Sequence, residues 1–334
     1  MNQQEFFAAS GIGLLYLVRM LGLFMVLPVL PVLALDISGA TPFLIGLAIG
    51  IYGLSQAALQ IPLGLLSDRI GRKQVIGLGL GLFIAGSLIA GFAENIHVLI
   101  LGRFMQGCGA IASSLLALLS DLTRVDQRAK AMALVGIAIA GSFGLSLILG
   151  PLISSYIGLS GIFFLTAALG LLGLVILLLF IATPQVRSIN LDTKVQKNLI
   201  GVVIGNQGLW RLNLSIFVSH YLLVSLFMVL PVLFLNTGRI EFADHSLYYL
   251  ALLGISFIGM LPFMWLSDRL TDVRVLLVLV VSLALIACWI MGSFAGYWWV
   301  LFAALLFFIA FNLLEVVLPA QVSRQSEAGA RGTA

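Results

Sequence analysis

The sequence predicts an all-α polytopic membrane protein made of two parallel repeats, and three observations lead to this fold class. Of the 334 residues, 61% are hydrophobic and 9% are charged, whereas a soluble domain carries about 25% charged residues. Apolar runs of roughly 20 residues, the length that crosses the hydrocarbon core of a bilayer, recur along nearly the whole chain. An identical octapeptide, LFMVLPVL, occurs at Leu23–Leu30 and again at Leu226–Leu233.

Each apolar run between two short polar breaks is predicted to form one transmembrane helix. Six spans precede a long polar stretch and four follow it, which gives ten: 11–35, 42–66, 74–93, 98–120, 131–154, 161–182, 211–236, 246–267, 275–294 and 297–320. The runs are continuously apolar and lack the alternation that is typical of barrel strands, so helices are expected.

The basic residues predict the orientation of these spans. Of the 17 Lys and Arg residues, 14 fall in alternate breaks, whereas the opposite breaks contain only Arg239. The basic breaks are 68–73, 121–130, 183–211, 268–274 and 321–334. Under the positive-inside rule these breaks face the cytoplasm. We therefore expect a multi-pass protein of the cell inner membrane with both termini cytoplasmic. Its expected partner is the lipid bilayer, and no nucleic-acid partner is expected.

The repeated octapeptide is one of two internal matches. QIPLGLLSDRI at Gln60–Ile70 is matched by MLPFMWLSDRL at Met260–Leu270, at nearly the same offset. Because the first copy has six spans, the second copy enters the membrane from the same side, as in parallel repeats. We predict an N-terminal six-helix bundle at 1–182, a cytoplasmic linker at 183–210 and a C-terminal bundle at 211–334. The offset leaves the second bundle with four helices, so we expect a truncated form of a twelve-span design.

The charged turn between spans two and three predicts a conformational latch on the cytoplasmic side. Its six residues are Gly64, Asp68, Arg69, Gly71, Arg72 and Asp121. Asp68 can face a helix N-terminus, where partial positive charge favours a carboxylate, and Arg72 can pair with Asp121 at the end of span four. The two glycines permit close approach and a tight turn. The alternative is an orienting loop whose charges are merely solvated.

Four charged residues in or beside the spans are candidates for proton coupling. Arg19 and Arg103 lie inside spans one and four, where a charge costs at least a few kcal/mol; snorkelling to the interface is the alternative to a place in a central cavity. Glu315 is the only acidic residue inside any predicted span and is the first candidate for the proton carrier. It could instead snorkel or pair structurally, and Asp36, at the outer end of span one, is the second candidate.

Several strings resemble the major facilitator superfamily, in particular its drug:proton antiporter branch. Gly64–Lys73 matches the signature G-x-L-a-D-r-x-G-r-k at every defining position, and Arg103–Ala110 is similar to the pattern R-x-x-q-G-x-g-a of span four. Leu21–Pro31 resembles l-g-x5-P-v-x-P of span one. The resemblance covers almost the whole chain and implies two bundles that rock about a central substrate site, with Arg103 helping to couple proton movement to that change.

Span five carries Gly150 and Pro151, which resemble the antiporter motif g-x-x-x-G-P-x-x-G-G. The match is incomplete because Ser146, Ser154 and Ser155 stand where glycines are usual. Serine is still small, so close packing can survive, but the assignment of antiport over symport is weakened.

Together these features predict a secondary active transporter that moves small, lipophilic or amphipathic molecules by alternating access, through proton-coupled efflux. A proton-coupled uptake symporter of a metabolite and an inactive truncated transporter fragment remain open as alternatives. We expect a monomer that binds a small-molecule substrate and uses the proton gradient without a cofactor or metal, since no phosphate-loop string occurs and Cys108 and Cys288 lie far apart. An enzyme is not expected, because no G-x-S-x-G or H-E-x-x-H string accompanies the three histidines.

Overall fold

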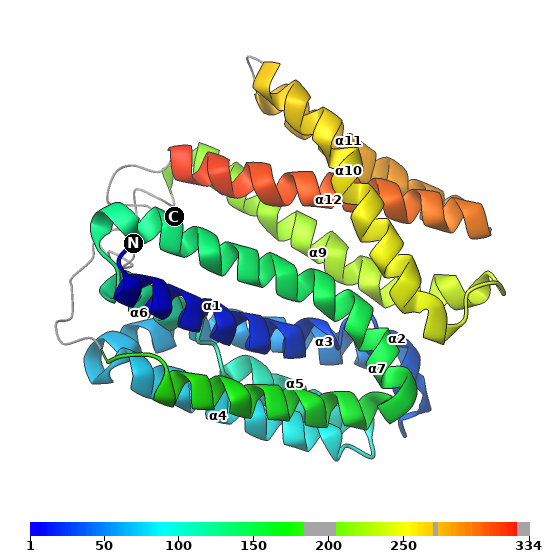
Figure 1. The fold of residues 1–334 in the computed structure, drawn as a ribbon. Helices are drawn as coiled ribbons and strands as arrows, with labels where there is room; N and C mark the ends of the chain where they lie inside the picture. Colours follow the sequence, from blue (N-terminus) through cyan, green and yellow to red (C-terminus); the bar gives the residue numbers. More distant parts are fainter. Residues whose placement is uncertain (184–204, 270–272, 295, 326–334) are drawn as a thin grey trace. The chain divides into compact units, whose positions relative to one another are not determined.

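A computed structural model describes residues 1–183, 205–269, 273–294 and 296–325, and within these ranges the named secondary-structure elements are all helices (Figure 1). The chain divides into two compact units, Met1–Thr193 and Lys194–Ala334. In the described ranges nine helices are long and apolar enough to cross a membrane. The predicted all-α membrane fold is therefore confirmed, and each unit is described by itself below.

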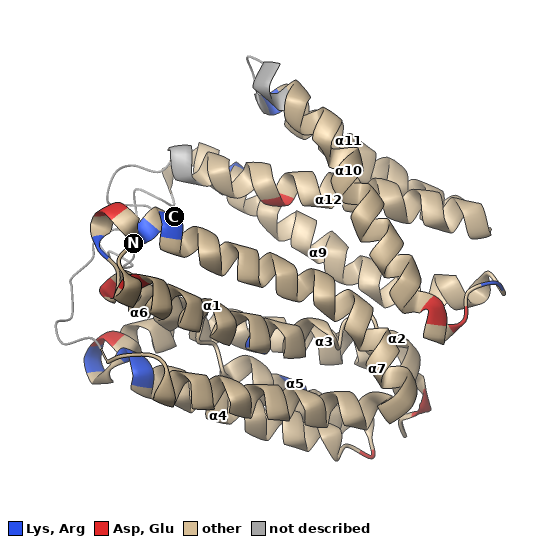
Figure 2. Cartoon of the chain, in the orientation of Figure 1, with Lys and Arg blue, Asp and Glu red and all other residues tan. Residues whose placement is uncertain are grey.

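Among the described residues 1–183 of the first unit there are seven α-helices and two short 3-10 helices. In chain order they are α1 (Gln3–Phe24), α2 (Leu30–Leu33), η1 (Ala34–Asp36), α3 (Pro42–Ile70), α4 (Arg72–Gly91), α5 (Ile96–Cys108), α6 (Ala112–Asp121), η2 (Val125–Gln127) and α7 (Arg128–Leu179). Helix starts carry the expected side-chain caps: Asn2 and Glu5 form a capping box, and Thr41 and Asn95 accept from the backbone N–H three residues on. Lys, Arg, Asp and Glu gather mostly at the helix ends (Figure 2).

Two predicted spans of this unit are interrupted. Span one, expected at 11–35, begins earlier, at Gln3, because Asn2 caps it, and its long helix stops at Phe24 before Pro28 and Pro31. Span four consists of α5 and α6, separated at Gly109–Ile111. Backbone N–H and C=O groups that leave the helix at membrane depth need hydrogen-bond partners within the protein. We therefore expect polar side chains to contact the backbone at these two breaks.

Helix α7 contains two spans. It has 52 residues, and at about 1.5 Å per residue it is more than twice as long as one crossing requires. Gly158 has φ +67° and ψ −172°, a left-handed backbone position that only glycine adopts without strain. The chain turns back at this bend (Figure 1), which places the spans predicted at 131–154 and 161–182 on its two sides.

The repeated octapeptide takes two conformations. At Leu23–Leu30 it includes the break between α1 and α2, whereas at Leu226–Leu233 it lies inside the continuous helix α9. The residue after the octapeptide is Pro31 in the first copy and Phe234 in the second. Two prolines three residues apart remove two backbone donors and clash with the preceding turn, so the second proline accounts for the break.

The second unit is built from α9 (Gln207–Asn236), η3 (Phe242–Asp244), α10 (His245–Arg269), α11 (Val273–Ser293) and α12 (Tyr297–Gln325). Helix α12 packs on α9, α10 and α11, and in the first unit α5 likewise packs on α3 and α4. The core of this unit is aliphatic: Leu212, Met260, Leu276, Val280, Ala284, Ala310, Leu313, Leu314 and Leu318. In each unit the helix of the fourth span, α5 or α12, therefore lies against the helices of the second and third spans.

Candidate functional site

The charged turn between α3 and α4 is folded into a compact network centred on Arg72. Gly71 ends α3 with φ +122°, so the chain turns at once and Arg72 begins α4. The Arg72 guanidinium forms an ion pair with Asp68, donates from Nε to Asp121 Oδ2 at 3.2 Å, and donates from Nη1 to Ser67 Oγ at 2.7 Å. The Arg72 and Asp121 side chains are only 11% and 2% exposed, which argues against a freely solvated loop.

Gly64 lets α6 approach α3 just before this turn. A methyl group at Gly64 would lie 2.9 Å from Ser113 Oγ, and the Ser113 hydroxyl donates to the carbonyl of Gln60 at 3.0 Å. Arg69 lies exposed in the last turn of α3. The structure thus brings together the predicted latch residues Asp68, Arg72 and Asp121, with Gly64 and Gly71 shaping the backbone.

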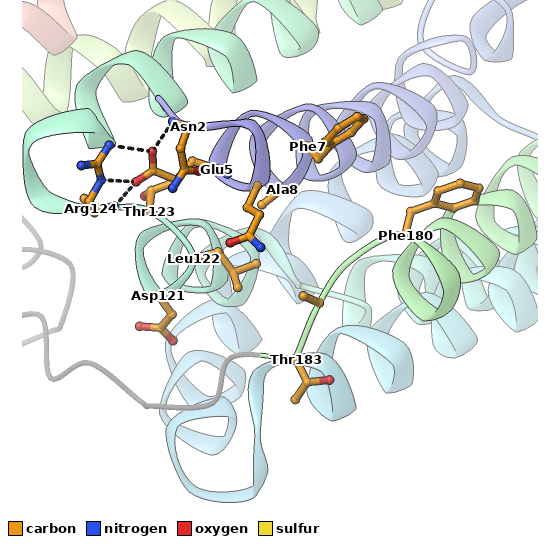
Figure 3. A pocket seen from close by; sticks show the side chains of 12 residues that line it. Asn2, Glu5, Phe7, Ala8, Asp121, Leu122, Thr123, Arg124, Phe180 and Thr183 are labelled. Carbon is orange, nitrogen blue, oxygen red and sulfur yellow. Dashed lines mark hydrogen bonds and ion pairs between the residues drawn. The ribbon is translucent and has the colours of Figure 1, made fainter.

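A second ion pair, Glu5–Arg124, lies next to the latch. The sequence patterns did not predict it. The Glu5 carboxylate accepts from Arg124 Nε at 2.8 Å and from Arg124 Nη2 at 3.2 Å, while it also caps the N-terminus of α1 (Figure 3). The Glu5 carboxylate raises the pKa of the Arg124 guanidinium above its ordinary value. The N-x-x-E string at Asn2 could have predicted the helix start, but not the partner that lies 119 residues away.

A pocket of about 870 Å³ opens between this ion pair and the latch residue Asp121. Its lining is mixed: Asn2, Gln4, Glu5, Phe7, Ala8, Asp121, Leu122, Thr123, Arg124, Phe180, Ala182 and Thr183. Figure 3 shows the Phe7 and Phe180 rings on the opposite side from the Glu5–Arg124 pair. The pocket is therefore polar at one end and aromatic at the other.

Arg103 lies in α5 and is 1% exposed. Its guanidinium donates hydrogen bonds only to uncharged acceptors in the described structure. Its Nε donates to the carbonyl of Ala48 at 3.1 Å and its Nη1 to Gln106 Oε1 at 2.8 Å. Gln106 in turn donates to Ser87 Oγ at 2.7 Å, so the network joins α3, α5 and α4. The snorkelling alternative is wrong for this residue.

Arg19 is also 1% exposed and lies against the break in span four. Its Nη2 donates to the carbonyl of Gly109 at 3.0 Å and to the Tyr52 hydroxyl at 3.3 Å. One turn earlier, the Tyr16 hydroxyl donates to the carbonyl of Ala112 at 2.8 Å. The snorkelling alternative is wrong here too, because the buried Arg19 guanidinium donates a hydrogen bond to the Gly109 carbonyl, where the backbone has left the helix.

The acidic candidates for proton coupling are both exposed, in different units. Glu315 Oε1 lies 3.4 Å from His220 Nε2, with side chains 43% and 51% exposed, so α12 and α9 meet through two groups that can carry a proton. Asp36 is exposed in η1, between α2 and α3. The pairing of Glu315 with a histidine was not visible in the sequence, where the two residues are 95 positions apart.

Gly150 and Pro151 lie in α7 where it packs against the break in span one. A methyl group at Gly150 would be 2.7 Å from the carbonyl oxygen of Met25. Ser146, which replaces a usual glycine, donates to the carbonyl of Leu21 at 3.1 Å. The serine therefore fits the close α1–α7 contact and adds a hydrogen bond to it.

Comparison with known proteins gives consistent similarities. A family model described as Major Facilitator Superfamily matches residues 12–334. The chain is 41% identical over 330 residues to the inner membrane transport protein YajR of Escherichia coli, which covers 98% of this chain and 72% of YajR. It is 28% identical over 228 residues to the quinolone resistance protein NorA of Staphylococcus aureus, which covers 67% of this chain and 54% of NorA.

The fold is also similar to that of solved transporters. A bacterial homolog of the human lysosomal transporter Spinster, in an inward-facing and unoccupied conformation, superposes with a TM-score of 0.80 at 16% identity. This match covers 100% of the chain and 78% of the Spinster homolog.

Proposed function

Because the chain belongs to the major facilitator superfamily, we propose that it is a proton-coupled exporter of small lipophilic or amphipathic molecules. Its relatives and its fold are those of transporters and not of enzymes, and its apolar helices are those of a multi-pass membrane protein. The proposal adds the coupling ion, the direction and the substrate class. It also includes the inner membrane as the location, with both termini in the cytoplasm.

The pair formed by Glu315 and His220 carries the coupling proposal. Glu315 is the only acidic residue inside the predicted spans, and it lies 3.4 Å from the imidazole of His220. A carboxylate and an imidazole can each take up and release a proton, and a protonated imidazole offsets the charge of the neighbouring carboxylate. In this proposal Glu315 holds the proton, His220 stabilises the carboxylate form, and Arg103 supplies a fixed positive charge in the first unit. Asp36, exposed at the span end, is a weaker candidate.

The direction and the substrate class are supported by the relatives and by the antiporter-like contact. NorA is a quinolone resistance protein, which is consistent with export of amphipathic drugs. Gly150 packs on the broken backbone of span one at Met25, and Ser146 keeps that contact close. We propose that this contact and the Arg72-centred latch hold the first unit rigid while the carrier changes between its two open states.

The proposal is tested in proteoliposomes that contain the chain, in parallel with a longer version that has two further spans. Uptake and release of ethidium are followed by fluorescence after a pH gradient of either sign is imposed. Antiport predicts that ethidium moves against the proton flow, and symport predicts that it moves with it. Absence of gradient-driven movement in both versions would contradict the carrier proposal.

Glu315→Gln is expected to abolish the dependence on the pH gradient, because the amide cannot release a proton at this position. Glu241→Gln, which changes an exposed acidic residue at the start of η3, is the matched control and should retain coupling. A Glu315→Gln protein whose transport still follows the pH gradient would rule out Glu315 as the proton carrier.

A further inference from the structure

The first unit contains two buried cations that meet only neutral acceptors. Arg19 and Arg103 are each 1% exposed. Arg19 donates to the Gly109 carbonyl and the Tyr52 hydroxyl, and Arg103 donates to the Ala48 carbonyl and the Gln106 side chain. In the described part of the chain, no ion pair is formed by either guanidinium. Buried charges in proteins are ordinarily paired with an opposite charge.

The sequence of this unit offers no carboxylate at the depth of the two arginines. The acidic residues of 1–183 all lie at or between helix ends: Glu5, Asp36, Asp68, Glu94, Asp121 and Asp126. Arginine keeps its proton at physiological pH, so both positive charges persist. Within residues 1–183, therefore, no carboxylate balances these two charges.

Tyr52 connects the two cations. Its hydroxyl lies 3.3 Å from Arg19 Nη2, and its ring centre lies 4.7 Å from the central carbon of the Arg103 guanidinium. One side chain on α3 thus contacts both guanidinium groups. An anion beside Arg19 would experience the attraction of both charges in a region of low dielectric constant.

Arg19 also has hydrogen-bonding capacity that the protein does not use. Its Nε and Nη1 are buried and lack an acceptor in the described part of the structure. Capping the Gly109 carbonyl requires only Nη2, so a purely structural role leaves two donors of the fork without a partner. Buried donors without an acceptor are uncommon and point to an absent ligand. The Nε–H and Nη1–H groups point to different sides of the guanidinium, so either one can form a single charge-assisted hydrogen bond to an anion.

We propose that the Arg19–Tyr52–Arg103 cluster is an anion-binding site that takes a carboxylate group or a halide ion. The anion accepts from Nη1 of Arg19, and its charge offsets the two positive charges of Arg19 and Arg103. The site is closed to solvent in this conformation, and the interruption of span four at Gly109–Ile111 lies directly on it. This inference deepens the proposed function, on which it rests for the role of the anion as substrate or co-ion, although binding itself is independent of transport.

The test measures the unfolding temperature of the purified full chain in detergent. Chloride or acetate is titrated while a bulky sulfonate salt keeps the ionic strength constant. A ligand that binds only the folded state raises the unfolding temperature saturably, here by about 2–8 °C. The chloride arm reports a free halide, and the acetate arm reports the carboxylate of an organic ligand. An effect that is equal for every salt and does not saturate would overturn the proposal.

Three variants locate the site. Arg19→Gln should lose the saturable shift, and Arg19→Lys, which keeps the charge but loses the fork, should bind at least about tenfold more weakly. Arg239→Gln, which alters an exposed arginine of the second unit, should behave as the original chain. If Arg19→Gln does not fold, the anion affinity of Arg19→Lys tests the location of the site. A saturable shift unchanged in the Arg19 variants would overturn the proposed location.

Failure of this site is distinguishable from failure of the proposed function. Gradient-driven ethidium transport without a saturable anion shift would remove the anion site and leave the carrier intact. A saturable, Arg19-dependent shift in a chain that transports nothing would retain the site and remove the carrier.

Discussion

The contact between α4 and α5 allows a sharp test of the packing, because two glycines of the same helix have opposite surroundings. A methyl group at Gly86 would lie 2.5 Å from the backbone nitrogen of Gln106 and 2.6 Å from the carbonyl oxygen of Gly102. Both are backbone atoms, which cannot rotate away. A methyl group at Gly81 would meet nothing within 4 Å.

The size of the effect follows from these distances. Ordinary contact begins at 3.4 Å, so Gly86→Ala requires the helices to separate by about 1 Å, a gap that forfeits a quarter to a half of the dispersion energy across the contact. Overpacking of this kind costs about 1–3 kcal/mol. Gly81→Ala instead should gain about 0.5–1 kcal/mol, because alanine favours the helix. The two variants are expected to differ in free energy of unfolding by about 1.5–4 kcal/mol.

The assay is equilibrium unfolding in mixed detergent micelles, followed by tryptophan fluorescence and circular dichroism. Gly86→Ala should unfold at a lower denaturant fraction than the original chain, and Gly81→Ala at an equal or higher one. Because Gln106 belongs to the Arg103 network, Gly86→Ala should also reduce transport. Equal stability of the two variants would refute the close backbone contact between α4 and α5.

Three further predictions follow from other contacts. Arg72→Ala should abolish transport while leaving membrane insertion and expression intact, since it removes the centre of the latch; unchanged transport in vesicles would demote the latch. Glu5→Gln should release Arg124 and speed trypsin cleavage there in the folded protein, and an unaltered cleavage rate would show that the ion pair does not hold this turn. Gly158→Ala should destabilise the chain by about 1 kcal/mol because of the positive φ, whereas Gly136→Ala, which has nothing within 4 Å, should not; equal unfolding curves would contradict a bend fixed at Gly158.

The sequence was sufficient for features that depend on the chain locally. Continuous apolar runs predicted the spans, and the short charged string between spans two and three predicted a charged cluster between α3 and α4. The octapeptide shows where local information ends, because identical residues are helical at Leu226–Leu233 and broken within Leu23–Leu30. The deciding residue, Pro31, lies just outside the repeated string.

The family-like signature predicted the distant pair Arg72–Asp121, but two other distant pairs could not be predicted, for a physical reason. The pair Glu5–Arg124 joins α1 to the turn before η2, and the pair His220–Glu315 joins α9 to α12. Each meeting depends on how the helices involved are rotated about their axes. Apolar periodicity fixes that rotation poorly in a membrane helix, because the lipid-facing side is as apolar as the core.

Helix α1 shows how the breaks in the first unit are stabilised together. In the C-terminal half of α1, Tyr16 donates to the carbonyl of Ala112 and Arg19 donates to that of Gly109, at the interruption of span four. In the last turn of α1, the carbonyls of Leu21 and Gly22 accept from Ser146 and Thr166 of α7 at 3.1 Å each.

These bonds couple the interruptions of two spans to one helix. Backbone that leaves the helix in a bilayer has no water for its hydrogen bonds, so sliding α1 would remove the Arg19 donor from the Gly109 carbonyl. A buried group left without a partner costs about 1–3 kcal/mol. Ser146 and Thr166 also bond carbonyls of their own helix, so the cost falls mainly at the interruption of span four. We therefore expect α1 and the α5–α6 junction to move together in any conformational change of this unit.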